Sequence, residues 1–503
     1  MKLTPLTPLG KVHTYFATIQ LRRLPICGAI TLLIAAFLLT LDRTDLVHSH
    51  EARAAQNAQY ILETGEWGLP RLFDGRLELQ KPPAYYWCVA GISRWLNSGR
   101  VTAWTTRLPS ALMGIACIVG VYAFLRQLGR PYTARVAAVV LATAIHFTAL
   151  SRIARIDVPL TAAVSFSIFS FFLGCISHSQ GKRFHSLAWH FLAGLSVGIA
   201  MLLKGPIGIA LFGCATGMWW LIEHRRVNWS GVVTLIATAA CVGLPWFLWA
   251  NRATEGELFR VFILHHNIAR FSGTSSQLAT HPWWFYIPRF TFDFLPWSPF
   301  FFFGIYYVLK KNMWKTDHIL RFSLISFLSI LSLLSLSHFK RSDYLLPAYP
   351  FAAIYISCVI QNWWENQGFS TRKRSLLFFH SLWITVIVGW IVIVSAVEPH
   401  LRTQDKRSQF AASIRHVAPA PQPIIQFRME DHLLSFHLGR PLETIVEWHD
   451  LHQIIYHYKY SYIIMPKEYV YPAANILSDI KWKKLLESNL TNNRIYIFLS
   501  ACQ

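Results

Sequence analysis

Long apolar runs recur along this chain from about residue 24 to about residue 397. A helix needs about 20 apolar residues to cross the hydrocarbon core of a bilayer. The composition agrees, because 53% of the residues are hydrophobic and only 14% are charged, a combination that is rare in soluble domains. The sequence therefore predicts a polytopic α-helical membrane protein with about 11 to 13 transmembrane helices. Candidate spans are centred near residues 33, 117, 142, 167, 196, 214, 240, 301, 328, 353 and 387.

The loops between these runs form two alternating sets. Loops of the first set are short and basic, which is typical of cytoplasmic loops. They explain much of the formal net charge of +22, so the charge indicates contact with anionic membrane lipids and not with nucleic acid. We expect an inner-membrane protein with a cytoplasmic N-terminus, because an odd number of spans then leaves the C-terminal end outside. The basic loops contain Lys11, Arg22, Arg23, Arg126, Arg130, Arg135, Lys182, Arg183, Arg225, Arg226, Lys310, Lys311, Lys315, Arg372, Lys373 and Arg374.

The chain changes character after about residue 397, which divides it into a transmembrane part, 1–397, and a C-terminal domain, 398–503. Short runs with strand-like composition alternate there with amphipathic stretches, a pattern that predicts a small extracytoplasmic α/β domain. No catalytic motif lies in it, so we expect it to cover the outer face or to help bind an acceptor. The strand-like runs are 422–427, 461–465 and 494–499, and the amphipathic stretches are 405–416, 448–458 and 476–486.

The first outer loop, residues 42–107, carries two polar features at the membrane surface. Glu51 is expected in the first turn of a helix that continues to Leu62, where the helix dipole favours a carboxylate by about 0.3–1 kcal/mol. The alternative role for Glu51 is that of a general base at the mouth of a membrane cavity. Lys81 stands directly before two prolines, which make the backbone rigid. It is either an ordinary lysine that reaches the interface or a fixed cation for a lipid phosphate.

The order of motifs from His50 to Trp87 resembles the first outer loop of the dolichyl-phosphate-mannose protein mannosyltransferase family. The resemblance is closer to the bacterial branch with the lipid A 4-amino-4-deoxy-L-arabinose transferases. It implies a GT-C-type fold and transfer of a sugar from a polyprenyl phosphate. The matching residues are His50-Glu51, Gly65-Glu66-Trp67, Pro70, Gly75, Lys81-Pro82-Pro83 and Tyr86-Trp87.

One position departs from the family pattern. The family has an aspartate, its prime catalytic candidate, where this chain has His50. The base role then passes to Glu51, or to His50 itself, since a histidine also accepts a proton near neutral pH. The remaining alternative is a family member with altered or lost activity.

Motifs further along the chain resemble later outer loops of the same family. Asp157 corresponds to a second important acid, so the predicted catalytic set is Glu51, Asp157 and His50. The alternative for Asp157 is an interfacial ion pair with Arg155, worth roughly 0–1 kcal/mol when exposed. Lys204 either holds a phosphate oxygen or forms a polar corner between two spans. The residues predicted to bind the lipid phosphate or the sugar are Arg53, Lys81, Arg107, Arg155, Lys204, His266, Arg270, Lys340 and Tyr344.

These features predict a membrane glycosyltransferase that moves a sugar, with inversion, to an extracytoplasmic glycolipid, glycan or protein. No cofactor is expected. A metal site remains an open alternative, although His265, His266 and His281 lack zinc-type spacing. A transporter or flippase of lipid-linked substrates is the main rival, and it requires polar residues within spans. The clearest candidates for such residues are His146 and His190, each of which is equally well a buried, hydrogen-bonded histidine.

Overall fold

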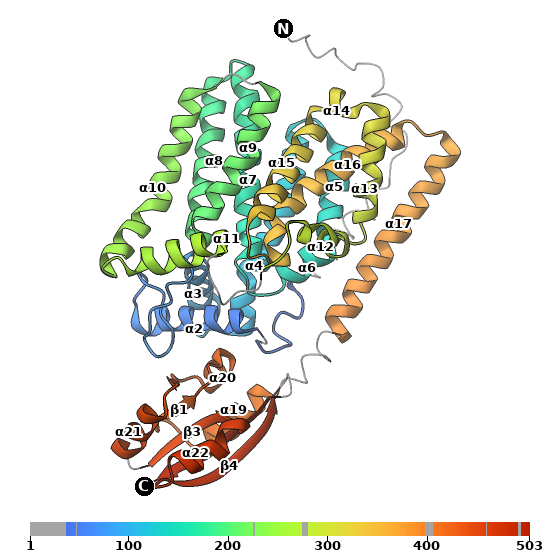
Figure 1. The fold of residues 1–503 in the computed structure, drawn as a ribbon. Coiled ribbons are helices and arrows are strands. Elements are labelled where there is room, and N and C mark those ends of the chain that lie inside the picture. Colours follow the sequence, from blue (N-terminus) through green and yellow to red (C-terminus); the bar gives the residue numbers. More distant parts are fainter. Residues whose placement is uncertain are drawn as a thin grey trace.

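The protein consists of a bundle of membrane-spanning helices and a smaller sheet domain (Figure 1). The computed structural model describes residues 37–46, 48–224, 227–273, 280–397, 400, 406–458, 460–490 and 494–502. Within these residues, eight helices are long and apolar enough to cross a membrane, and two bent helix pairs bring the number to ten. They coincide with the ten predicted spans from residue 117 onward, which confirms a multi-pass membrane protein. The predicted span near residue 33 and the pair Arg225-Arg226 lie outside the described residues.

The described helices before the tail follow the predicted order. Two short outer helices, α2 and α3, come before the first described span, and a π-helix, η1, lies in the large outer loop. The bounds are α2 Ser49–Thr64, α3 Ala84–Leu96, α4 Ala103–Gln127, α5 Pro131–Thr143, α6 Ile145–Ser151, α7 Asp157–Ser179, α8 Arg183–Lys204, α9 Pro206–Glu223, α10 Trp229–Ala253, η1 Phe259–Ala269, α11 Arg270–Ser272, η2 Trp283–Phe285, α12 Tyr286–Asp293, α13 Ser298–Lys311, α14 Met313–Thr316, α15 His318–Leu336, η3 Ser342–Ala348, α16 Tyr349–Glu365, α17 Phe369–Val392 and η4 Ile393–Val397.

The spans differ in how much of their surface other helices cover. Helix α16 is almost wholly enclosed, whereas α10 and α17 expose most of their apolar side chains. Because lipid tails are as apolar as a protein core, a span can face lipid without a polar side. Figure 1 places α10 and α17 at opposite flanks of the bundle and α14, in a basic loop, at the end opposite α2. The predicted alternation of basic and polar loops thus corresponds to the two ends of the bundle.

Two broken spans meet at their breaks. The axes of α5 and α6 differ by 67°, and those of the segments Trp283–Asp293 and Ser298–Lys311 differ by 112°. The amide of Ile145 donates to the carbonyl oxygen of Leu295 at 3.0 Å, and the indole of Trp297 donates to the Thr143 hydroxyl at 2.9 Å. Polar backbone groups at membrane depth require such internal partners. The broken pairs therefore bring His146, at the start of α6, next to Asp293.

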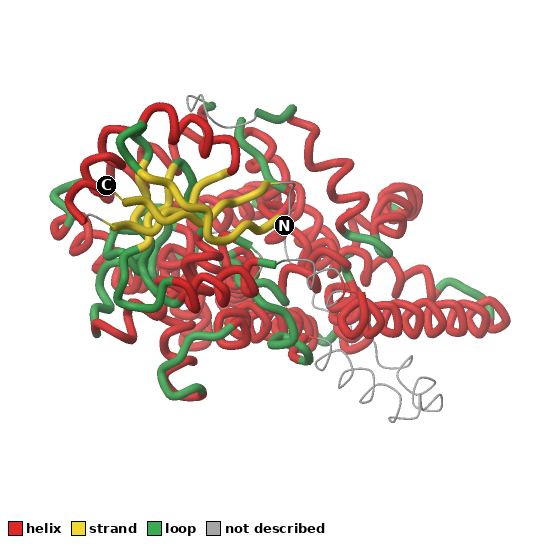
Figure 2. The backbone as a smooth tube through the Cα atoms, turned by 90° about the horizontal axis from the view of Figure 1, so that it is seen from below, coloured by secondary structure: helices red, strands yellow, loops and turns green. Residues whose placement is uncertain are grey.

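The C-terminal domain is the predicted α/β unit. Its sheet has five strands in the order β2-β1-β3-β5-β4, with β2, β1 and β3 parallel and β5 antiparallel to both β3 and β4. Figure 2 shows these strands gathered over one part of the helical bundle. The elements are α19 Arg407–Val417, β1 Ile424–Phe427, α20 His432–Leu438, β2 Glu443–Ile445, α21 Trp448–Tyr458, β3 Tyr460–Pro466, η5 Lys467–Tyr469, α22 Val470–Ile476, β4 Lys481–Leu490 and β5 Arg494–Cys502.

The three predicted strand-like runs coincide with β1, β3 and β5. The stretch 476–486, predicted as an amphipathic element between strands, is not a separate element of the structure. Most of it belongs to the strand β4, which pairs with β5 over its whole length. Pairing with a neighbouring strand overrides a local helical pattern, because hydrogen bonds and cross-strand packing reward the extended form. The predicted boundary at residue 397 stays a prediction, since residues 398–399 and 401–405 are outside the described part.

The C-terminal domain rests on the first outer loop through α20. Gln56 of α2 donates to the carbonyl oxygen of His432 at 2.8 Å, and Arg76 donates to the carboxylate of Glu430 at 2.8 Å. Leu433 of α20 joins the apolar core of the membrane part. The domain thus lies beside the loop that carries five of the twelve predicted site residues.

Candidate functional site

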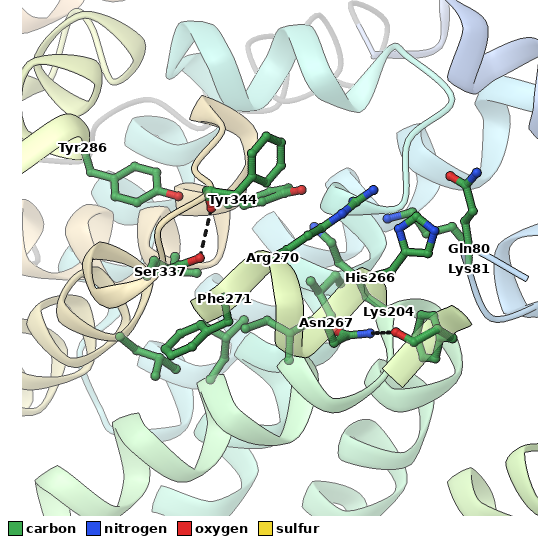
Figure 3. A pocket seen from close by; sticks show the side chains of 17 residues that line it. Gln80, Lys81, Lys204, His266, Asn267, Arg270, Phe271, Tyr286, Ser337 and Tyr344 are labelled. Atoms are coloured by element: carbon green, nitrogen blue, oxygen red, sulfur yellow. Dashed lines mark hydrogen bonds between the residues drawn. The ribbon is translucent and has the colours of Figure 1, made fainter. Parts of the chain in front are cut away.

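A cavity of about 810 Å³, counted with its open mouth, lies at the outer end of the bundle. Five predicted binding residues line it, which are Lys81, Lys204, His266, Arg270 and Tyr344. They come from four separate segments: the first outer loop, the end of α8, the η1–α11 helix and the short helix η3 after α15. Figure 3 shows the nitrogen-bearing ends of Lys81, His266 and Arg270 gathered in one part of the cavity. The rest of the lining is largely apolar and includes Leu160, Ile207, Leu211, Phe262, Leu333 and Leu334.

Within the described part of the chain, Lys204 pairs with Asp157, whereas Lys81 and Arg270 form no ion pair with a carboxylate. Burial, the charge of Lys204 and that of Arg270 lower the pKa of Lys81 to about 7, although Asp157 opposes the shift. Nε of Arg270 and Nδ1 of His266 are buried without a hydrogen-bond partner among the described residues. Burial and the charge of Arg270 lower the pKa of His266 to about 4, so His266 is neutral near pH 7. An excess of buried positive charge of this kind favours an anionic ligand.

Glu51 and Arg107 form a buried pair away from the cavity lining. Glu51 lies in the first turn of α2, as predicted, and its carboxylate accepts from Nε and Nη2 of Arg107 at 2.8 and 3.2 Å. It also accepts from the amide of Ala154 at 3.0 Å. Burial alone raises the pKa of Glu51, but the charge and hydrogen bonds of Arg107 outweigh it and lower the pKa to about 2.

Arg107 adds bonds to the chain before α2, where it donates to the carbonyl oxygens of Leu41, Thr44 and Asp45. The pair therefore ties this segment and the α6–α7 connection to α4. Its geometry favours a positioning role over proton transfer and over contact with the substrate. Catalysis by Glu51 and substrate binding by Arg107 stay predictions, and the complete burial of both side chains does not support them.

His50 lies nearer to the solvent than Glu51. Its Nε2 is 3.4 Å from Nη1 of Arg341. Partial burial and the charges of Arg155, Arg341 and Lys81 lower the pKa of His50 to about 4. The imidazole is therefore neutral at pH 7 and is able to accept a proton, but it is a weak base while the surrounding cations lack an anion. A bound phosphate would offset those charges and raise the pKa of His50.

Asp157 belongs to a chain of ion pairs that borders the cavity. Its Oδ1 lies 2.6 Å from Nζ of Lys204, and its Oδ2 lies 3.8 Å from Nε of Arg155. Arg155 also pairs with Asp343 at 2.5 Å, and Nη2 of Arg341 lies 3.3 Å from the same carboxylate. The interfacial pair considered for Asp157 and Arg155 is present, but as one link of a longer network. Lys204 completes it, with Nζ 4.2 Å from the centre of the Tyr344 ring.

Sequence reasoning missed Asp343 and Asp293 as parts of this network. Asp343 stands between the noted Lys340-Arg341 and Tyr344, so an acid within a basic outer motif was the available signal. His146 lies 3.6 Å from Asp343 and 3.8 Å from Asp293, at the break between α5 and α6. It therefore sits at the outer polar network and not in the middle of a continuous span. His190 is buried, with Nδ1 2.7 Å from the carbonyl oxygen of Ser186.

Two predicted binding residues are held by other partners. Nε of Arg53 donates to the buried carboxylate of Glu78 at 2.8 Å. Nζ of Lys340 is turned to the carbonyl oxygens of His281, at 3.0 Å, and Ser337. Neither residue is part of the cavity lining, and their binding roles stay predictions.

The described residues include no assembled set of metal ligands. In the part of the chain that the structure describes, no group of three or more His, Cys, Asp or Glu residues is arranged to hold a metal ion. The three histidines that the sequence offered, His265, His266 and His281, thus do not come together as ligands. Whether the reaction needs a cofactor stays a prediction.

Residues 80–249 match the family model described as dolichyl-phosphate-mannose-protein mannosyltransferase. The predicted resemblance to this family is confirmed. A Pseudomonas paraeruginosa undecaprenyl phosphate-alpha-4-amino-4-deoxy-L-arabinose arabinosyl transferase is 28% identical over 69% of this chain and 62% of its own length. The enzyme of the same name from Pseudomonas aeruginosa is 30% identical with the same coverage. The aligned part thus spans less than two thirds of these relatives.

Solved structures extend the likeness in fold to nearly the whole chain. The apo structure of ArnT from Cupriavidus metallidurans has a TM-score of 0.76 at 16% identity, covering 94% of this chain and 97% of that one. The same protein bound to undecaprenyl phosphate gives a TM-score of 0.73. An Archaeoglobus fulgidus oligosaccharyltransferase gives 0.56 at 11% identity, with 88% and 68% covered. The predicted GT-C-type fold with a small C-terminal α/β domain is therefore confirmed.

Proposed function

We propose that this protein is a membrane glycosyltransferase that moves a sugar from a polyprenyl phosphate to an extracytoplasmic acceptor. The observation that carries the proposal is the outer cavity, where Lys81, Lys204 and Arg270 meet beside apolar walls. A lipid-linked sugar phosphate has both matching parts, an anionic head and an apolar tail. The relatives named above are arabinosyl transferases of undecaprenyl phosphate-linked aminoarabinose, and the related ArnT structure holds undecaprenyl phosphate.

The cations would act on the leaving group. As the acceptor oxygen or nitrogen attacks the sugar's anomeric carbon, the bond from that carbon to the phosphate oxygen breaks and the polyprenyl phosphate gains charge. Fixed cations in a partly dry site stabilise that charge more than water does. Attack from the face opposite the leaving phosphate inverts the anomeric carbon. Lys81 and Arg270 are best placed for this work, because no carboxylate among the described residues pairs with either of them as Asp157 pairs with Lys204.

The acceptor's proton needs a base on the other side of the sugar. His50 is our candidate, since it is neutral at pH 7 and close to the cations that the phosphate would neutralise. Donor binding would then raise the pKa of His50 and make it a stronger base at the moment it is needed. Asp157 is the second candidate, although its pair with Lys204 suits it better to positioning that lysine.

The remaining features complete the proposal. The acceptor is a lipid A-like glycolipid, a glycan or a protein, and no cofactor is required. The N-terminus lies in the cytoplasm and the C-terminal domain outside the inner membrane, because the basic loops mark the opposite end of the bundle. An arrangement of this kind allows the donor tail to stay in lipid while its head reaches the acceptor.

Release of free undecaprenyl phosphate by the purified protein tests the proposal. The assay supplies undecaprenyl phosphate-linked 4-amino-4-deoxy-L-arabinose as donor and lipid A as acceptor. We expect release that depends on the acceptor and is lost in the double variant Lys81→Gln/Arg270→Gln. The matched control is Lys311→Gln, which removes an exposed charge at the far end of the bundle.

Two results would contradict the proposal, one of them the transfer reaction and the other the donor site. Donor binding without release with every acceptor tried would indicate a binding protein or a transporter, and His50 in place of the family's aspartate would then mark a family member without activity. Release that persists at full rate in the double variant would show that the cavity is not the donor site.

A further inference from the structure

The C-terminal domain has a topological switch point that the proposed reaction does not use. β1 and β3 are parallel neighbours. After β1 the chain enters α20, which packs with Ile424 and Ile464 on one face of the sheet. After β3 it enters α22, which packs with Ile425 and Ile463 on the other face. In open α/β sheets, ligands bind outside the carboxyl ends of the strands at the place where such connections diverge.

Arg428 occupies this place. Its guanidinium carbon lies 5.2 Å from the ring centre of Trp448, 5.3 Å from that of Tyr469 and 5.5 Å from that of Phe427. Arg428 and Phe427 stand at the end of β1, Trp448 follows β2, and Tyr469 follows β3. The cluster therefore draws on the carboxyl ends of all three parallel strands, which are far apart in the sequence.

The backbone of Arg428 is in an unfavourable conformation. Its φ is +50°, in the left-handed region that residues with a Cβ rarely adopt. Two hydrogen bonds hold it there, from its amide to the carbonyl oxygen of Ile445 and from its Nε to that of Val446, each 2.8 Å long. Strain of this kind persists only where the surroundings impose it, and it is concentrated at functional sites.

These two hydrogen bonds leave both Nη groups of the Arg428 guanidinium available to a ligand. Among the described residues, neither Nη atom of Arg428 donates to a protein acceptor, and the side chain forms no ion pair. The two Nη groups of a fixed arginine form a planar fork that matches a phosphate or carboxylate. The indole of Trp448 and the phenol of Tyr469 are partly exposed beside the guanidinium, and the C–H groups of a sugar ring pack on aromatic rings of this kind.

Arg428 lies in the segment between β1 and α20, which contacts the first outer loop through Glu430 and His432. Arg428 is two residues before Glu430, which pairs with Arg76, and four before α20, which contacts α2. Figure 1 likewise shows α20 and β1 on the side of the C-terminal domain that is nearer α2. A ligand at Arg428 would thus be held close to the contact between the C-terminal domain and the first outer loop.

We propose that Arg428, Trp448 and Tyr469 bind a saccharide that carries a phosphate or carboxylate group. Resting on the proposed transferase function, the inference goes further and assigns this ligand as the acceptor, held by the C-terminal domain before transfer. The site is distinct from the donor cavity, since the two share no residue.

Binding of glucose 1-phosphate to the full-length protein in detergent tests the site. All variants are built on the Lys81→Gln/Arg270→Gln background, so that the donor cavity does not capture the anion. Isothermal titration or saturation-transfer NMR compares glucose 1-phosphate with glucose and with inorganic phosphate. We expect glucose 1-phosphate to bind at least about tenfold more tightly than either, which corresponds to about 1.4 kcal/mol.

Three substitutions separate recognition from folding. Arg428→Gln should abolish the preference for glucose 1-phosphate over glucose, and Arg428→Lys should keep only part of it because lysine lacks the fork. Trp448→Leu should weaken both sugars. Lys483→Gln, which removes an exposed charge from β4 in the same domain, should change nothing. A merely structural Arg428 would lower the melting temperature without changing the preference.

Failure of the proposed saccharide site can be distinguished from failure of the proposed transferase function. The proposed site is wrong if glucose 1-phosphate binds Arg428→Gln as tightly as the background protein, or if inorganic phosphate binds as tightly as the sugar phosphate. Intact binding together with absent undecaprenyl phosphate release would instead contradict the transferase function and leave the site standing.

Discussion

Two groups of charged residues at the outer end of the bundle differ in how their charges are balanced. Glu51 and Arg107 are both buried, and each is matched by the other and by backbone groups. Lys81 and Arg270 are brought together with Lys204 although like charges repel, and Nε of Arg270 lacks a described partner. A balanced buried pair holds parts of the chain in place, whereas an unbalanced cluster is ready for a ligand. The comparison predicts opposite effects of mutation in the two groups.

The largest effect should follow from breaking the balanced pair. Removing one partner of a buried ion pair costs about 3–5 kcal/mol, because the other charge stays buried without compensation. Glu51→Ala should therefore lower the free energy of unfolding by that amount, measured by thermal or denaturant unfolding in detergent. The control Glu63→Ala, at an exposed position of the same helix, should have almost no effect. If the Glu51 variant kept the free energy of unfolding of the unmodified protein and lost only transfer activity, Glu51 would be the catalytic base.

Breaking the unbalanced cluster should weaken ligand binding and spare stability. A hydrogen bond to a charged group is worth about 1.5–3 kcal/mol, so Lys81→Gln or Arg270→Gln should weaken undecaprenyl phosphate binding by roughly 10- to 150-fold. The melting temperature without ligand should stay the same or rise, because repulsion among the cations is relieved. Native mass spectrometry or competition binding measures the affinity. A marked loss of stability with unchanged affinity would place these residues with the structural group.

The pH dependence of binding sharpens the comparison further. The pKa of Lys81 is lowered to about 7 by burial and by Lys204, and a bound anion would raise it again. Binding then takes up a proton, so the affinity should fall as the pH rises above about 7, by at most tenfold per pH unit.

The phosphate titrates in the same range, so a reference variant is needed. Lys81→Arg stays charged at every pH used and reports the phosphate alone. The ratio of the two affinities should change between pH 7 and pH 9, and a constant ratio would contradict the low pKa of Lys81.

The smallest effect is expected where charges are balanced but exposed. Arg76 and Glu430 join the first outer loop to the C-terminal domain at the surface. Exposed pairs contribute about 0–1 kcal/mol, so a double-mutant cycle of Arg76→Ala and Glu430→Ala should give a coupling energy in that range. A coupling of several kcal/mol would show that this contact, and not the packing of Leu433, fixes the domain on α2.

Local patterns predicted the parts of the fold that depend on local physics. Ten predicted spans coincide with helices or bent pairs, because apolar runs of sufficient length are helical in lipid whatever their neighbours are. The first turn of α2 with Glu51 was also predicted locally, because the helix dipole favours a carboxylate there. The breaks at Ala144 and before Trp297 were not predicted, since they depend on hydrogen bonds between two spans that are distant in sequence. The strand β4 was missed because its partner β5 decides its conformation.

The sequence by itself determined that this chain crosses a membrane many times, and it named the side chains at the outer surface. It also predicted which family the first outer loop resembles. Only the tertiary structure decided which of those side chains act together. Lys81, Lys204, His266, Arg270 and Tyr344 share a cavity, while Arg53, Arg107 and Lys340 are held by other partners. The physical reason is that burial and charge balance depend on all neighbours in space, and the sequence shows only the neighbours along the chain.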